Sequence, residues 1–195
     1  GDQVIIPSYV CTAVLNAVYH AGAEPVLADI DPETFNMDPR DAAGRVTART
    51  RAIIVPHMFG LAADLDGLLG LGIPLIEDCA QAVGAHYHGR ALGTFGVASV
   101  FSFYATKMMT TGEGGLVASR DPKIIERVMN LRDYDNRPDY CVRYNYKMTD
   151  LQAALGSSQM RRLDDFVARR AALAARYDTL LAGSGLTLPP RTADG

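Results

Sequence analysis

Several features that would direct the chain to a particular partner are scarce or missing. Nineteen lysines and arginines stand against 22 aspartates and glutamates, so there is no basic excess to neutralise a phosphate backbone. No apolar run approaches the roughly 18 residues that span a bilayer, and the first ten residues lack the basic region and cleavage pattern of a signal peptide. We therefore expect no nucleic acid and no membrane among its partners, and a cytoplasmic location.

Cysteine is scarce as well. The three cysteines, Cys11, Cys79 and Cys141, are an odd number at wide spacing, which suits neither a disulfide framework nor a zinc knuckle, so we expect reduced thiols. His86 and His88 could share one face of a strand as metal ligands, but no third ligand is evident nearby. We interpret them as ordinary polar residues of a strand and predict no metal site.

What the chain does contain is the pattern of an α/β domain. Its 195 residues, with 48% hydrophobic and 21% charged side chains, suit a globular protein of one domain or slightly more. Short apolar runs alternate with helical periods, which predicts a mostly parallel sheet covered by helices. The expected strands are Val4–Pro7, Pro25–Asp29, Ala52–Pro56, Pro74–Glu77, Ala98–Phe103 and Gly115–Ser119. The expected helices between them are Thr12–Ala21, Asp38–Val46 and Asp64–Leu71.

The last third of the chain reads as helical. Asp121 followed by Pro122 is typical of a helix start, and an apolar stripe predicts that this helix ends near Asp133. A capping box at Thr149–Gln152 begins a long helical region, with a break expected near Arg161–Asp164. The run DYDNRPDYCVRYNY between these helices has no period and predicts an irregular connector, the kind of segment that often carries site residues.

Familiar phosphate and nucleophile motifs are missing too. GEGGLV lacks the last glycine of GxGxxG, and neither GxxxxGK[ST] nor GxSxG occurs. Instead, Asp78 ends a buried strand and Lys107 lies in the loop after a neighbouring strand, both toward the edge where open α/β sheets bind ligands. With Ser102 they supply the amine, the acid and the hydroxyl that pyridoxal phosphate requires.

Each of these residues also has an ordinary structural interpretation. Lys107 beside a glycine-rich loop could be a solvated surface charge. Asp78 and Gln81 could form a capping box that opens the next helix. Ser102 could be a plain strand residue and Asn145 a plain loop amide. Spacing alone therefore leaves pyridoxal phosphate as one hypothesis among several.

Six segments in order, however, resemble one family. They are GDQVIIPSYV, GAEPVLADIDPETFNMDP, RAIIVPHMFG, IEDCAQAVGAHYHGRALGTFG, FSFYATKMMTTGEGG and YNYKMTDLQAALG. Over residues 1–183 the chain resembles the DegT/DnrJ/EryC1/StrS family of pyridoxal-phosphate-dependent nucleotide-sugar aminotransferases. The resemblance implies a three-layer α/β fold, the large domain of a fold-type I aminotransferase, with residues 184–195 beginning the connection to a smaller C-terminal domain.

The resemblance also implies a role for individual residues. Lys107 in SFYATK matches the Schiff-base lysine, and Asp78 in EDCAQA matches the carboxylate paired with the pyridine nitrogen. Gln81 matches the glutamine beside the cofactor ring and its 3-hydroxyl, and Ser102 matches a hydroxyl on the cofactor phosphate. Asn145 in YNYKM matches an asparagine that reaches the phosphate of the partner subunit's cofactor, which implies a homodimer with shared sites.

The chain departs from the family pattern in three places. Cys11 stands where many relatives have an aromatic residue stacked on the cofactor, so we expect a thiol contact there. The N-terminal turn that holds the phosphate and the C-terminal domain that closes the site are both expected outside this chain. The sequence therefore predicts a fragment truncated at both ends, and a catalytically inactive folding or dimerisation unit is an alternative function.

The resemblance implies that glutamate donates an amino group to a keto group on a nucleotide-linked deoxysugar. Family members that dehydrate such sugars carry histidine at the position of Lys107, which disfavours that reaction here. Amination of a cyclitol or another non-sugar ketone stays open, because the residues that select the substrate extend beyond this chain.

Overall fold

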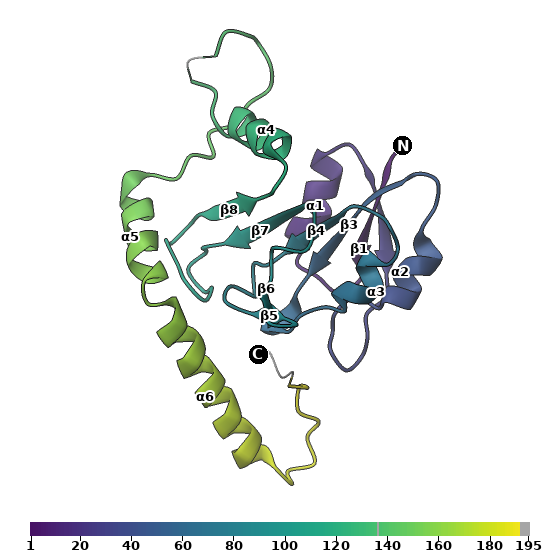
Figure 1. The fold of residues 1–195 in the computed structure, drawn as a ribbon, viewed down its shortest axis with the longest axis vertical. Coiled ribbons are helices and arrows are strands. Elements are labelled where there is room, and N and C mark those ends of the chain that lie inside the picture. The colour runs from purple at the N-terminus through teal and green to yellow at the C-terminus, as the bar shows by residue number, and fades with distance from the viewer. Residues whose placement is uncertain (136, 192–195) are drawn as a thin grey trace.

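The computed structural model describes residues 1–135 and 137–191, and within them a six-stranded sheet forms the centre of the molecule (Figure 1). The strands follow the order β2-β1-β3-β4-β7-β8, in which the first five are parallel and β8 runs antiparallel to β7. The prediction of a mostly parallel sheet is confirmed. Its strands are β1 (Gln3–Pro7), β2 (Glu24–Ala28), β3 (Thr50–Pro56), β4 (Leu75–Asp78), β7 (Ala98–Ser102) and β8 (Gly115–Ala118). A separate hairpin pairs β5 (His86–Tyr87) with β6 (Arg90–Ala91).

The predicted helices begin within about one residue of their expected starts, and four of them have a side chain at the N-cap that accepts a hydrogen bond from the first turn. The Asp38 carboxylate accepts a hydrogen bond from the Arg40 N–H, and the Thr149 and Gln152 side chains form the expected capping box. The predicted break after the capping-box helix is also confirmed. The helices are α1 (Thr12–His20), α2 (Pro39–Arg45), α3 (Leu65–Leu69), α4 (Pro122–Arg132), α5 (Asp150–Met160) and α6 (Leu163–Leu181), with a short 3-10 turn, η1 (Met58–Gly60). Among the described residues, none of these helices combines the length and apolar character needed to cross a membrane.

Consecutive residues of a strand pack against helices on opposite faces of the sheet. Ile5 and Ile53 lie in a cluster with residues of α2 and α3, whereas Ile6 and Ile54 pack with Val14 and its neighbours in α1. Since side chains alternate across a strand, α1 covers one face of the sheet and α2 with α3 cover the other. The three-layer prediction is confirmed for this part of the fold, and α6 extends away from the sheet (Figure 1).

The predicted division at residue 183 stays a prediction. Gly183 follows α6 and has a positive φ of 77°, so the helix ends where the expected large domain ends. Residues 184–191 of the expected connection have no helix or strand, and residues 192–195 lie outside the described part of the chain.

Candidate active site

One edge of the sheet collects most of the residues singled out by sequence. Strands β1, β3, β4 and β7 are neighbours and parallel, so their carboxyl ends meet at the same edge. Five candidate residues end these strands or follow them. They are Cys11 after β1, Asp78 at the end of β4, Gln81 just beyond it, Ser102 at the end of β7 and Lys107 in the loop that follows.

Asp78 ends β4 half-buried, and its carboxylate is only partly used by the protein. Oδ1 accepts a hydrogen bond from the Ala80 N–H at 2.9 Å, while no hydrogen bond among the described residues engages Oδ2. The main chain on either side is fixed, since the Asp78 carbonyl accepts from the His57 N–H at 3.1 Å and the Cys79 N–H donates to the Val100 carbonyl at 2.8 Å. A rigid strand end therefore presents a carboxylate with one oxygen available.

The alternative interpretation of Asp78 and Gln81 as a capping box is wrong, because no helix follows β4. Instead, two tight turns close when Ala82 N–H bonds to the Cys79 carbonyl and Ala85 N–H bonds to the Ala82 carbonyl. Asp78 caps only the first of these turns. Gln81 is exposed, and its Oε1 accepts a hydrogen bond from the Phe59 N–H at 3.2 Å in η1.

The loop that carries Lys107 is closed on itself by bonds to Phe103. The Thr111 N–H and the Thr110 hydroxyl both donate to the Phe103 carbonyl, at 2.9 and 3.2 Å. Phe103 and Met109 are buried together, so the loop has a firm base. Lys107 lies between them in sequence and is half-buried, and Ser102 Oγ accepts from the Tyr104 N–H at 3.3 Å.

Asn145 lies apart from this group. It is exposed on the connector between α4 and α5, where the flanking Tyr144 and Tyr146 donate main-chain hydrogen bonds to Leu131 and Arg132 at the end of α4. The two tyrosine rings stack 4.8 Å apart. No hydrogen bond or ion pair of the described residues joins Asn145 to the candidates at the sheet edge.

The cysteines are all free, as the sequence predicts. Cys11 is exposed at the N-terminus of α1, where its thiol caps no N–H group. Cys79 is buried beside Asp78. Burial, together with the negative charges of Glu77 and Asp78, raises the pKa of the Cys79 thiol far above its ordinary value. Cys79 is therefore an inert core residue, and Cys11 is the accessible thiol next to this edge.

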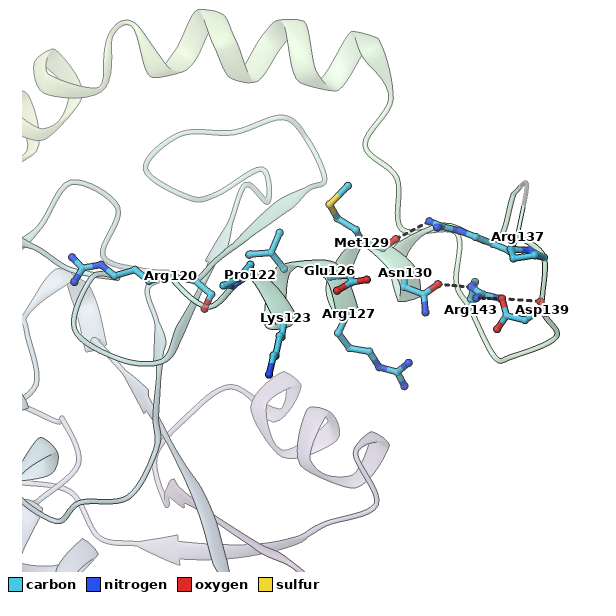
Figure 2. Close-up of a pocket in the computed structure, with 13 residues that line it drawn as sticks. Arg120, Pro122, Lys123, Glu126, Arg127, Met129, Asn130, Arg137, Asp139 and Arg143 are labelled. Atoms are coloured by element: carbon cyan, nitrogen blue, oxygen red, sulfur yellow. Dashed lines mark hydrogen bonds and ion pairs between the residues drawn. The ribbon is translucent and has the colours of Figure 1, made fainter.

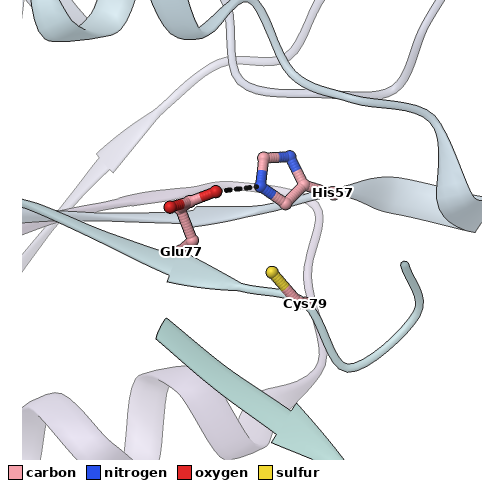
Figure 3. A group of neighbouring side chains, drawn as sticks. All are labelled: His57, Glu77 and Cys79. Carbon is pink, nitrogen blue, oxygen red and sulfur yellow. Dashed lines mark hydrogen bonds and ion pairs between the residues drawn. The ribbon is translucent and has the colours of Figure 1, made fainter. Parts of the chain in front are cut away.

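Sequence reasoning missed a buried polar cluster directly behind the edge (Figure 3). His57, Glu77 and Cys79 bring their ligand-type atoms within 4.8 Å of one another. The available signal was a charged residue inside the apolar strand that ends at Asp78. The cluster does not suit a metal ion, since both Glu77 oxygens and both His57 nitrogens are already engaged in hydrogen bonds within the protein.

The histidine pair of the hairpin does not share a strand face. His86 lies in β5, but His88 adopts a positive φ of 50° in the turn before β6, which directs the two side chains differently. The exposed His88 Nε2 lies 3.1 Å from an Asp66 carboxylate oxygen. The expectation of ordinary polar strand residues is confirmed for His86 and is wrong for His88, which lies in the turn.

A cavity of about 930 Å³ lies between α4 and the connector, away from the candidate residues (Figure 2). Five basic and two acidic side chains line it, but none of the site residues expected from the sequence does. In Figure 2, Lys123 and Arg127 point one way from α4, whereas Arg137 and Arg143 lie on the connector. Because these cations do not converge, the edge with Lys107 is the better candidate active site.

An α/β domain with an amine, a carboxylate and a hydroxyl at the carboxyl edge of its sheet has the groups that pyridoxal phosphate requires. The donor set fits the cofactor, since Asp78 retains a free oxygen and Lys107 forms no ion pair within the described residues. The chain belongs to the DegT/DnrJ/EryC1/StrS aminotransferase family, whose model matches residues 1–194. Family membership indicates pyridoxal 5′-phosphate as the cofactor.

Individual relatives agree with this assignment. The chain is 38% identical to the GDP-perosamine synthase of Caulobacter vibrioides, over 97% of this chain and 54% of that protein. It superposes on DesV from S. venezuelae, solved in complex with a ketimine intermediate, with a TM-score of 0.92 and 38% identity over 99% of this chain and 54% of the other. A 3-amino-5-hydroxybenzoic acid synthase matches with a TM-score of 0.87 and 32% identity, over 94% and 51%. The chain spans about half the length of the curated relatives it matches.

Proposed function

We propose that the complete gene product containing this chain transfers an amino group, with glutamate as donor, to a keto group on a nucleotide-linked deoxysugar. The observation that carries the proposal is that Asp78 and Ser102 end the neighbouring parallel strands β4 and β7, and Lys107 follows β7, in a chain that matches an aminotransferase family over its length. The GDP-perosamine synthases of three organisms among its relatives support a nucleotide-linked sugar as substrate.

Two residues carry the chemistry in this proposal. Pyridoxal phosphate, when bound, supplies an electron sink that stabilises a carbanion next to the amino group. The Lys107 amine would hold the cofactor covalently and, once displaced by the amino donor, would carry a proton between the donor's Cα and C4′ of the cofactor. The free Oδ2 of Asp78 keeps the ring nitrogen protonated by pairing with its positive charge.

The other candidate residues orient the cofactor. Gln81 Oε1 accepts from Phe59, and its Nε2 lies 3.9 Å from the Met58 sulfur, so one amide N–H remains to donate to the cofactor's 3-hydroxyl oxygen. Ser102 donates to the phosphate, and Cys11 contacts the ring in place of an aromatic side chain. Asn145 serves the site of a partner subunit, so the proposal includes a homodimer. The homodimer and the cytoplasmic location stay predictions.

The first experiment identifies the lysine. The gene product is incubated with pyridoxal phosphate and reduced with borohydride, and the labelled peptide is identified by mass spectrometry. We expect the label on Lys107, no label in Lys107→Ala, and undiminished labelling in Lys123→Ala, which removes an exposed lysine from α4. Equal labelling of Lys107→Ala would show that another lysine holds the cofactor.

A second experiment identifies the substrate class. The purified gene product is assayed with glutamate against a panel of nucleotide-linked ketosugars, alongside cyclitol ketones and an aminohydroxybenzoate precursor. The proposal expects turnover of at least one nucleotide sugar. The 3-amino-5-hydroxybenzoic acid synthase among the structural neighbours supports amination of a non-sugar ring as the second candidate, and activity toward only such compounds would favour it.

The remaining alternative is a folding or dimerisation unit without activity. It is tested by measuring cofactor affinity and transamination for residues 1–195 beside the complete gene product. We expect weak cofactor binding and no turnover for residues 1–195 alone, since the chain spans about half of its relatives. Comparable activity of residues 1–195 and the complete gene product would exclude this alternative.

A further inference from the structure

The end of β4 is held by a buried network that the reaction itself does not use. Glu77 is fully buried, and its carboxylate receives four N–H groups. Oε1 accepts from Phe95 at 2.7 Å and from Gly96 at 2.8 Å. Oε2 accepts from Gly93 at 2.7 Å and faces His57 Nε2 at 3.4 Å. The carboxylate is therefore a negative centre around which the turn between β6 and β7 is folded.

His57 connects this centre to the neighbouring strand. Its Nδ1 accepts a hydrogen bond from the Ala63 N–H at 3.1 Å, so Nδ1 carries no proton and Nε2 is the donor that faces Glu77. The main-chain N–H of the same residue donates to the Asp78 carbonyl at 3.1 Å. His57 thus binds the side chain of Glu77 and the main chain of Asp78 at the same time, as Figure 3 shows for the side chains.

The turn that supplies the other donors leaves no room for a side chain at Gly93 or Gly96. Gly93 has a φ of 88°, and a Cβ there would approach the Phe101 ring, whereas a Cβ at Gly96 would overlap the Leu75 carbonyl oxygen. Three N–H groups can therefore reach Glu77 only because the turn packs directly on the strand. The network joins β3, β4 and the start of β7 at one point.

We propose that Glu77 and His57 are positioning residues that fix the orientation of Asp78 toward the cofactor; this rests on the proposed function. Glu77 and Asp78 are consecutive in a strand, so their side chains point to opposite faces, and locking one sets the direction of the other. The main-chain bonds of His57 and Cys79 on either side prevent the strand end from rotating. The network thereby fixes the main chain from which the Asp78 carboxylate projects, and the Ala80 N–H holds its Oδ1.

Glu77→Gln tests this proposal in the complete gene product. An amide can accept two of the four hydrogen bonds, but its NH₂ group would face the donors of Gly93 and His57. His57 cannot compensate by moving its proton to Nδ1, because Nδ1 accepts from Ala63. The matched control is Ser99→Ala, which removes a buried 2.8 Å bond from the Ser99 hydroxyl to the Gly93 carbonyl and leaves Glu77 and His57 intact.

The readouts are cofactor affinity and the spectrum of the bound cofactor as a function of pH. We expect Glu77→Gln to raise the dissociation constant of pyridoxal phosphate about tenfold, the effect of weakening the one hydrogen bond between Asp78 and the charged ring nitrogen. The absorption change that reports loss of the proton from the ring nitrogen should move to lower pH by about one unit. The reason is that a misaligned Asp78 stabilises the protonated ring nitrogen less. Ser99→Ala should lower the melting temperature about as much as Glu77→Gln does. It should nevertheless change the affinity for pyridoxal phosphate less than about twofold.

The outcomes distinguish a positioning role of Glu77 and His57 from a purely structural one. Equal effects of the two variants on affinity and spectrum would show that the network only stabilises the fold and would overturn the proposal. If Glu77→Gln does not fold, His57→Gln replaces it, since that change leaves the three main-chain donors on Glu77 and must still shift the spectrum. A wild-type protein that binds no pyridoxal phosphate would instead overturn the proposed function and this inference with it.

Discussion

Gln81 Oε1 accepts a hydrogen bond from the Phe59 N–H over 3.2 Å, which joins the turn after β4 to the turn after β3. Phe59 has a positive φ of 58°, an uncommon conformation for a residue with a large side chain. The bond from Gln81 satisfies the N–H of this strained residue. The amide oxygen of Gln81 is therefore occupied before any cofactor is bound.

Gln81→Glu separates the role of the Gln81 amide oxygen from the role of its amide N–H groups. The carboxylate keeps an acceptor for Phe59 but loses the N–H that faces the Met58 sulfur and the N–H proposed for the cofactor's 3-hydroxyl. We expect pyridoxal phosphate to bind about tenfold more weakly, while the melting temperature changes by less than about 3 °C. Titration of the cofactor and thermal unfolding measure the two effects. Unchanged affinity would show that Gln81 serves only the turn.

Gly96→Ala should destabilise the fold, because the new methyl group would overlap the Leu75 carbonyl oxygen. We expect a loss of more than about 2 kcal/mol in the free energy of unfolding. Gly44→Ala is the matched control, since Gly44 lies in α2 with open space around its Cβ position. There alanine should stabilise the helix by about 0.5 to 1 kcal/mol. Denaturant unfolding of the two variants provides the comparison.

Glu77 should make the fold sensitive to acid. Burial raises its pKa, but the hydrogen bonds from His57, Gly96, Gly93 and Phe95 outweigh burial, so the pKa lies below its ordinary value of 4.5. A lowered folded-state pKa means that Glu77 contributes stability above about pH 4.5, and that this contribution is lost as pH falls through the folded-state value.

The measurement is unfolding by denaturant between about pH 7 and pH 3, for the wild type and Glu77→Gln. The unfolding free energy of the wild type minus that of Glu77→Gln should be constant near neutral pH and should shrink as the pH falls. A difference that does not change with pH would mean that the Glu77 side chain binds no proton over this range.

The thiols should differ sharply in reactivity. Cys79 is fully buried with a raised pKa, whereas Cys11 and Cys141 are exposed. Under iodoacetamide, Cys79 should react only when the protein unfolds, while Cys11 reacts in the folded state. Because Cys11 is proposed to contact the cofactor, saturating pyridoxal phosphate should slow its labelling. Mass spectrometry of the labelled peptides gives the rates, and unaltered labelling of Cys11 would argue against the contact.

Asn145 is proposed to act on the partner's cofactor, which mixed dimers can test. Asn145→Ala and Lys107→Ala should each be inactive alone. Refolded together in equal amounts, they should regain about a quarter of wild-type activity, since half of the dimers are mixed and each mixed dimer has one intact site. Activity that stays absent on mixing would show that Asn145 acts within its own subunit.

The sequence by itself determined the six strands of the main sheet, most of the helices and the edge of the sheet where chemistry is expected, but not the β5–β6 hairpin. Apolar periodicity and helix caps are local, so the start of α4 at Pro122 and the capping box at Thr149 follow from residues a few positions apart. Placing Asp78 and Lys107 at one edge needed only the rule that parallel strands share their carboxyl ends.

What the tertiary structure decided was which polar groups meet. The capping box at Asp78 did not start a helix, because the following residues form two turns and Gln81 bonds to a residue 22 positions earlier in the chain. Glu77 could not be interpreted from its neighbours, since its partners lie between 16 and 20 positions away and reach it only through strand register and a glycine turn. Hydrogen bonds between distant segments depend on how the strands align, and that alignment is a property of the folded sheet as a whole.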